Sequence, residues 1–226
     1  MYKACIFDLD GTLTDTLESL TYSVNKTLEE LHLTHITSEQ CRRFVGNGSR
    51  VLLERALQAA GDKELLHIEE AVSTYARIFK TYCTYHVESY DGIPQMLEKL
   101  MTQGVQLGVL SNKPDAQANH VIETIFGNQV FTCVKGQCDE MPKKPDPTGA
   151  WFVAQHLHAR PEECLYVGDS DVDIETGTAA GMNTIGVTWG FREKEVLLNA
   201  GAKHTIDKPA ELIDLLEELE QKKEED

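Results

Sequence analysis

The sequence predicts an α/β fold in which a parallel sheet carries helices on both faces and is interrupted near its start by an all-helical insert. From residue 87 onward, short apolar or β-branched runs alternate with amphipathic helical stretches, which is typical of βαβ units. Between residues 14 and 86 the apolar residues follow only the helical spacing, and no run there has the features of a strand. We therefore expect a core of residues 1–13 and 87–226 and a helical domain of residues 14–86.

Six short runs are the strand candidates of the core. In chain order they are Lys3–Phe7, Val105–Leu110, Val130–Val134, Leu165–Val167, Thr184–Val187 and Thr205–Ile206. Helical spacing in the core is clearest at Ile93, Met96, Leu97 and Leu100, and again at Leu212, Ile213, Leu215 and Leu216. In the insert the same spacing relates Leu17, Leu20, Val24, Leu28 and Leu31. The turn Tyr90-Asp91-Gly92 is expected to mark the return to the core.

The composition limits the classes of partner. With 37 acidic and 21 basic residues the formal charge is −16, which argues against nucleic acid or an anionic membrane as a partner. No apolar stretch approaches the roughly 20 residues of a membrane helix, and the N-terminus lacks a signal-peptide pattern. The six cysteines lack the C-x-x-C spacing of zinc or redox sites. We expect a cytoplasmic protein with free buried thiols, either a monomer or a homodimer.

The segment Asp8-Leu9-Asp10-Gly11-Thr12 follows the first strand candidate. Strand alternation directs Asp8 and Asp10 to the same side, and Gly11 allows a sharp turn after them. Two carboxylates at the end of a strand suit a divalent cation together with a nucleophile and an acid or base. An isolated Asp-x-Asp pattern is also common in simple turns, so this segment needs support from elsewhere in the chain.

Two loops carry groups that suit a phosphate. Ser111 and Asn112 follow the second strand candidate, and Pro114 fits the first turn of a helix whose free amides bind phosphate oxygens. A plain helix cap is the alternative there. In Lys143-Lys144-Pro145-Asp146-Pro147, two prolines fix a lysine whose charge offsets that of a phosphoryl group. An ordinary surface loop is the alternative for that segment.

The segment Gly168-Asp169-Ser170-Asp171-Val172-Asp173 follows the fourth strand candidate. Its three carboxylates repel one another unless a cation or a lysine lies among them. A calcium-binding EF-hand loop does not fit, because Ile174 stands where that loop needs glycine and Ala180 where it needs glutamate.

Together the four segments resemble the haloacid dehalogenase superfamily in its phosphatase branch. That family has Asp-x-Asp-Gly-Thr, Ser/Thr-Asn, Lys-Pro and Gly-Asp-Ser-x-x-Asp in this order, and its cap domain occupies the place of the helical insert. The resemblance therefore spans the whole chain and implies a Rossmann-like core with strand order 3-2-1-4-5-6. It also favours phosphate substrates, because the carbon–halogen dehalogenases of the superfamily lack a counterpart of Asp10 and use no metal.

The resemblance implies catalytic roles for three residues. Asp8 is expected to attack phosphorus and become an aspartyl-phosphate. Asp10 is expected to protonate the leaving oxygen and then to act as base for the hydrolytic water. Lys144 is expected to stabilise the charge that the nucleophile and the phosphate share.

The resemblance also implies the residues that hold the cofactor and the phosphate. Mg²⁺ is expected on the carboxylates of Asp8 and Asp169 and the main-chain carbonyl of Asp10. Asp173 is expected to orient metal-bound water or to pair with Lys144. The phosphoryl oxygens are expected on Ser111, Asn112 and Thr12.

Softer signals point to the substrate, a small phosphorylated metabolite. The segments Phe44-Val45-Gly46-Asn47-Gly48-Ser49-Arg50 and Thr188-Trp189-Gly190-Phe191 look like those of phosphoglycolate phosphatases, although Gly46-Asn47-Gly48 also fits a turn between helices. If the first segment is functional, Gly46 belongs to the substrate site. Arg50 or Arg43 is then the expected partner of the substrate carboxylate, because arginine binds carboxylates bidentately; Arg50 equally fits a solvated helix. The expected substrate is 2-phosphoglycolate.

Alternatives remain on the same scaffold. A β-phosphoglucomutase would use Asp8 and Asp10 for phosphotransfer, and an inorganic pyrophosphatase would use the same motifs. A phosphate-binding module without activity is disfavoured, because no motif position is lost. The chain has no Walker A sequence, which argues against a P-loop nucleotidase.

Overall fold

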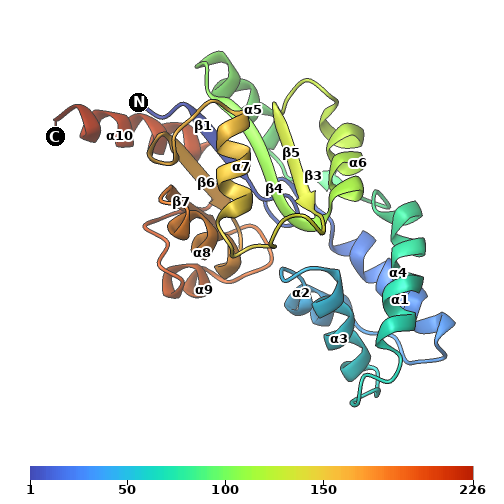
Figure 1. Ribbon diagram of the computed structural model, residues 1–226. Coiled ribbons are helices and arrows are strands. Elements are labelled where there is room, and N and C mark those ends of the chain that lie inside the picture. Colours follow the sequence, from blue (N-terminus) through green and yellow to red (C-terminus); the bar gives the residue numbers. More distant parts are fainter. Residues whose placement is uncertain (226) are drawn as a thin grey trace.

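A six-stranded parallel sheet forms the centre of the protein in the computed structural model, which describes residues 1–225 (Figure 1). Its strands are β1 (Ala4–Phe7), β4 (Gln106–Pro114), β5 (Cys133–Gln137), β6 (Cys164–Gly168), β7 (Asn183–Val187) and β8 (His204–Ile206). They lie in the order β5-β4-β1-β6-β7-β8. Counted along the chain among these six alone, that order reads 3-2-1-4-5-6; the labels differ because β2 and β3 form a separate ribbon. Asp226, the last residue of the predicted core, lies outside the described residues.

Helices cover both faces of this sheet. Cys5 and Phe7 of β1 belong to a hydrophobic cluster with α5 (Ile93–Thr102), α6 (Asp115–Phe126) and α10 (Glu211–Glu225). Ala4 and Ile6 point to the other face, where they pack with α7 (Thr148–His156). On that face α8 (Asp171–Ala179) also approaches β6, with Gly177 against Tyr166. Such alternation along a strand buried on both faces is typical of a doubly wound sheet, and the predicted fold class is confirmed.

A second hydrophobic cluster lies within the helical insert. It is built by α1 (Leu17–Glu30), α2 (Ser38–Phe44), α3 (Ser49–Ala59) and α4 (Ile68–Tyr82), with Leu28, Leu57 and Phe79 among its buried members. In Figure 1 these helices lie together beyond the arrowheads of β4 and β5. The extent of the insert as a domain stays a prediction.

Two short strands stand where the insert meets the core. β2 (Thr14–Asp15) pairs antiparallel with β3 (Glu88–Ser89). The sequence pattern indicated neither of these strands, because a two-residue strand leaves no alternation to detect.

The remaining elements are η1 (Pro161–Glu163) and α9 (Lys194–Asn199). All six strands differ from the expected bounds by at least one residue, and the differences are largest for β4 and β5. β5 begins at Cys133 rather than Val130, and β4 continues past Leu110 to Pro114 because Pro114 still pairs with Gln137 after a register shift. Ser111 and Asn112 therefore lie within the end of a strand rather than after it.

Two expectations from composition can be compared with the structure. All six cysteines are free; four are buried, whereas Cys133 and Cys138 are half-buried. Among the described residues, no helix has the length and apolar character required to cross a membrane.

Candidate active site

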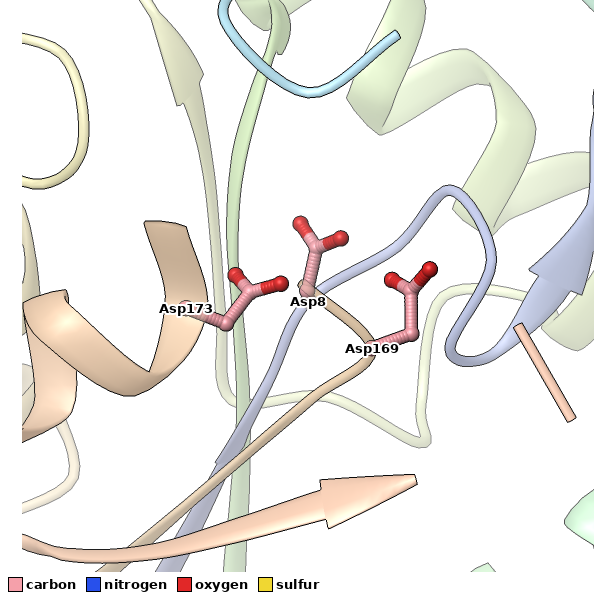
Figure 2. A group of neighbouring side chains, drawn as sticks. All are labelled: Asp8, Asp169 and Asp173. Atoms are coloured by element: carbon pink, nitrogen blue, oxygen red, sulfur yellow. The ribbon is translucent and has the colours of Figure 1, made fainter. Parts of the chain in front are cut away.

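Three buried carboxylates meet at the carboxyl end of the sheet (Figure 2). Asp8 follows β1 and Asp169 follows β6, and these strands are adjacent, with Phe7 opposite Val167. Asp173 reaches the same place from the first turn of α8. Each offers an oxygen within 4.8 Å of the others, and Figure 2 shows Asp8 between Asp169 and Asp173. The parallel pairing of the two strands brings Asp8 and Asp169 together although they are 161 positions apart in the sequence.

Lys144 connects two of these carboxylates. Its Nζ donates to Asp8 Oδ1 at 2.6 Å, to Asp173 Oδ1 at 2.7 Å and to the carbonyl of Leu110 at 3.1 Å. An ammonium has three hydrogens, so these acceptors use all of them. Burial lowers the pKa of Lys144, but Asp173 and Asp8 raise it more, so the pKa lies well above its ordinary value. Lys144 is therefore a fixed positive charge beside Asp8.

The charge of the cluster indicates that a cation belongs there. When all are ionised, three carboxylates and one ammonium carry a net charge of −2 in a buried site. Burial, with Asp173 adding to it and Lys144 opposing it, raises the pKa of Asp8 well above its usual range. Burial and Asp173 raise the pKa of Asp169 to about 7. Because oxygen ligands suit hard divalent cations, the residues present fit a divalent metal ion.

Hydrogen bonds hold the Asp169 carboxylate in place. Its Oδ1 accepts from the Thr12 hydroxyl at 3.1 Å and its Oδ2 from the main-chain N–H of Phe191 at 2.7 Å. Gly11 lies beside it with φ +93°, and a Cβ there would overlap the Asp169 carboxylate. Thr12 was expected to bind phosphate, but its hydroxyl bonds to Asp169 and the residue does not line the cavity. Such contacts orient a metal ligand.

Asn112 also differs from the expectation. Its side-chain amide donates to the carbonyls of Gly46 at 3.0 Å and Lys144 at 3.1 Å, and it accepts from the Lys144 N–H at 2.9 Å. These bonds hold the Lys144 loop and the insert, so the Asn112 side chain is already engaged, although the residue lines the same cavity as Ser111. Ser111 lines the cavity, and its Oγ accepts from the Lys113 N–H at 3.2 Å, so its hydroxyl hydrogen is available to a ligand.

A cavity separates the carboxylate cluster from the helical insert. Its floor includes Asp8, Ser111 and Lys144. Its apolar wall is formed mainly by the insert and consists of Leu20, Val45, Leu52, Tyr75, Phe79 and Phe191. Gly46 lines the cavity as well. A polar floor under an apolar wall suits a small ligand with one strongly charged end.

Asp10 lines the same cavity, with its side chain paired to a residue that the sequence analysis left without a role. Lys113 Nζ lies 2.9 Å from Asp10 Oδ1 and 4.7 Å from the centre of the Phe79 ring. The Lys113 side chain is only 1% exposed. The available signal was its place directly after Ser111-Asn112 at the end of a buried strand.

Arg192 is a second residue that the sequence did not indicate. Its guanidinium donates to the main-chain carbonyls of Arg42, at 2.8 Å, and Val45. It therefore connects the loop after β7 to the insert while lining the cavity. No sequence pattern reveals such bonds, because their acceptors are carbonyls about 150 positions away.

The two arginines expected to meet a substrate carboxylate lie elsewhere. Arg50 pairs with Glu69 at 2.6 Å and Glu54 at 3.3 Å, its side chain is 51% exposed, and it does not line the cavity. Arg43 pairs with Glu39 and is also exposed. The expectation for Arg50 is not supported, because it sits on the solvated side of α3, which was the alternative.

Comparison with known proteins agrees with this geometry. The family model described as haloacid dehalogenase-like hydrolase matches residues 5–187. A protein of Aquifex aeolicus named phosphoglycolate phosphatase is 32% identical over 216 residues, which cover 95% of this chain and 97% of that protein. A protein of Rhodospirillum rubrum with the same name is 33% identical over 224 residues, which cover 96% of this chain and 91% of that protein.

A solved structure gives the same result. The crystal structure of a protein described as a predicted phosphoglycolate phosphatase from Haemophilus somnus has a TM-score of 0.86 at 26% identity, over 95% of this chain and 98% of that one. The family match includes the insert and all four motif segments. The chain therefore belongs to the haloacid dehalogenase-like hydrolase family, where it is similar to phosphoglycolate phosphatases and is a phosphatase.

Proposed function

We propose that the protein is a magnesium-dependent phosphomonoesterase that hydrolyses 2-phosphoglycolate through an aspartyl-phosphate on Asp8. The buried cluster of Asp8, Asp169 and Asp173, with Lys144 hydrogen-bonded to two of them, is the observation that carries this proposal. The names of the similar proteins from Aquifex aeolicus and Rhodospirillum rubrum support the choice of substrate.

The first proposed step transfers the phosphoryl group to Asp8. A carboxylate oxygen of Asp8 forms a bond to phosphorus while the bond from phosphorus to the ester oxygen breaks, and Asp10 gives its proton to that oxygen. In the second step Asp10 takes a proton from a water molecule, whose oxygen attacks phosphorus and releases Asp8 and inorganic phosphate. Such transfers depend mainly on positioning and charge stabilisation, which Lys144 supplies as a fixed ammonium.

The proposed ligands of Mg²⁺ are the carboxylates of Asp8 and Asp169 and the main-chain carbonyl of Asp10. When bound, the ion offsets the repulsion between the phosphate and the Asp8 carboxylate. Asp173 keeps a different task, because its Oδ1 holds Lys144 and its Oδ2 accepts from the N–H and hydroxyl of Ser170 at 3.1 and 2.5 Å. With both oxygens engaged, Asp173 positions Lys144 rather than serving as a direct ligand.

A phosphate-release screen over small phosphorylated metabolites tests this proposal. Wild type and Asp8→Asn are compared with Mg²⁺ or with EDTA. We expect Mg²⁺-dependent release that is fastest from 2-phosphoglycolate and absent from Asp8→Asn. Faster phosphate release from sugar phosphates or pyrophosphate would show that 2-phosphoglycolate is not the preferred substrate. Interconversion of sugar 1- and 6-phosphates with little free phosphate would indicate a mutase. Undiminished release by Asp8→Asn would refute the mechanism.

A further inference from the structure

The cationic side chains along the cavity differ in how many of their hydrogen-bond donors are already used within the protein. Within residues 1–225, three cationic side chains line it: Lys113, Lys144 and Arg192. Lys144 donates all three hydrogens to Asp8, Asp173 and the Leu110 carbonyl. Arg192 is held by main-chain carbonyls of the insert. Neither is free to bind a second charged group of a ligand without giving up those bonds.

Lys113 is different. Among the described residues, Asp10 Oδ1 is the single hydrogen-bond partner of its ammonium, at 2.9 Å, and the Phe79 ring centre lies 4.7 Å from Nζ. An ammonium has three hydrogens, and a cation–π contact holds the charge without supplying an oxygen acceptor. The Lys113 side chain thus keeps donors for a ligand, in a place where it is 1% exposed. A charge-assisted hydrogen bond in such a water-poor site is strong.

The position of Lys113 indicates which part of a ligand it would meet. In the proposed mechanism Asp10 contacts the ester oxygen that leaves phosphorus. Lys113 is hydrogen-bonded to Asp10, so a group on the carbon attached to that oxygen comes close to the ammonium. In 2-phosphoglycolate that group is the carboxylate. The ammonium can then bridge Asp10 and the carboxylate with two of its hydrogens.

Resting on the proposed function, we propose that Lys113 is a specificity-determining residue whose ammonium binds a carboxylate next to the phosphorylated carbon. It selects small phosphorylated acids over small phosphate esters that lack the carboxylate. Phe79, which extends from α4 of the insert, holds the ammonium in place. Arg43 and Arg50, the residues first expected to bind the carboxylate, are exposed, are paired with glutamates and do not line the cavity.

Two substrates that differ only in the group on the phosphorylated carbon test the role of the carboxylate. 2-Phosphoglycolate and ethyl phosphate share the phosphorylated two-carbon chain, but ethyl phosphate has a methyl group where the acid has its carboxylate. For the wild-type, Mg²⁺-loaded protein we expect kcat/KM for the acid to exceed that for the ester by about 10- to 100-fold, the range of one hydrogen bond to a charged group. A wild-type ratio near 1 would overturn the inference without any variant.

Variants then locate the effect. Lys113→Met removes the charge and is expected to reduce the ratio to near 1, mainly by raising KM for the acid. Lys113→Arg is expected to restore part of it. Arg50→Met removes an exposed cation of the insert and is expected to leave the ratio unchanged. An equal loss of Lys113→Met activity on both substrates would show that Lys113 acts only through Asp10, and would refute the inference.

The same data separate this inference from the proposed function. Release that does not depend on Asp8 would defeat the proposed mechanism itself. Asp8-dependent hydrolysis of 2-phosphoglycolate with an unchanged ratio in Lys113→Met would keep the mechanism and remove only the role of Lys113. If Lys113→Met does not fold, as judged by circular dichroism, the wild-type ratio and Lys113→Arg still decide the matter.

Discussion

At the scale of single residues, one positive charge, that of Lys144, compensates the buried carboxylates of the site. Lys144 is the ammonium that contacts both Asp8 and Asp173, and its side chain is buried with them. A buried ion pair contributes little net stability when intact, but removing one partner leaves an uncompensated charge in a poorly solvated place. The same lysine therefore governs both stability and the proposed chemistry.

Replacing Lys144 tests this dependence. We expect Lys144→Met to lower the free energy of unfolding by about 3–5 kcal/mol in metal-free buffer, measured by urea denaturation. Phosphatase activity is expected to fall by about 10²-fold or more, the usual effect of losing one group that stabilises developing charge. Lys143→Met is the control, because Lys143 is exposed and, within residues 1–225, its ammonium donates only to the Asn47 carbonyl. Equal effects of the two substitutions would contradict the assignment.

At the scale of elements, the site residues that directly follow a strand could be predicted from the sequence. Asp8 and Asp169 were predictable as neighbours, because both follow apolar strands of a parallel sheet. The side-chain bonds of Thr12 and Asn112 were not, since they depend on which loop lies opposite each residue. Arg192 and Lys113 went unnoticed for the same reason: their partners are contributed by the insert or by another strand.

The turn after β1 offers a test at this scale. Gly11 has φ +93° and lies against the Asp169 carboxylate, whereas Gly201 has φ +95° and nothing within 4 Å of a built Cβ. Both Gly11→Ala and Gly201→Ala carry the backbone strain of a positive φ, about 1 kcal/mol or more. Only Gly11→Ala also displaces Asp169. We expect it to raise the Mg²⁺ concentration for half-maximal activity by about 10-fold, with Gly201→Ala unchanged.

At the scale of the whole molecule, hydrogen bonds across the cavity join the insert to the core. Arg192 donates to the Arg42 and Val45 carbonyls, Arg42 donates to the Gly190 carbonyl at 3.3 Å, and Asn112 donates to Gly46. The sequence predicted the insert and its helices from periodicity alone. It did not predict these bonds, because main-chain carbonyls leave no pattern in the amino-acid sequence.

Arg192 contributes two of these hydrogen bonds, and removing its side chain should make the insert locally more mobile. Arg192→Met leaves two carbonyls without their donor, which costs about 1–3 kcal/mol. We expect faster hydrogen exchange at residues 42–47 than in wild type, measured by mass spectrometry. Arg160→Met is the control, because Arg160 is exposed and its ion pairs among the described residues are with Glu162 and Glu163 of η1, far from residues 42–47 in the sequence. Unchanged exchange at residues 42–47 would show that the insert is held by other contacts.

The carboxylate cluster makes the stability of the whole protein depend on pH and metal together. Burial raises the pKa of Asp169 from 3.8 to about 7, and it raises the pKa of Asp8 in the same direction. At a pH between 3.8 and about 7, Asp169 is ionised in the unfolded chain but still protonated in the folded protein. The free energy of unfolding therefore falls as the pH rises through this range. A cation that binds the ionised carboxylates reverses this loss.

We therefore expect Mg²⁺ to raise the melting temperature more at pH 7 than at pH 5, with EDTA as the metal-free reference. Asp169→Asn removes the ionisable group and should make the Mg²⁺ effect smaller and less dependent on pH. Glu163 acts in the opposite sense, because hydrogen bonds from Arg160 and Lys3 lower its pKa and its contribution is lost as pH falls. Because Glu163 is present in both the wild type and Asp169→Asn, its contribution cancels when the two proteins are compared. Equal Mg²⁺ shifts at both pH values in the wild type would mean that no cation binds the ionised cluster.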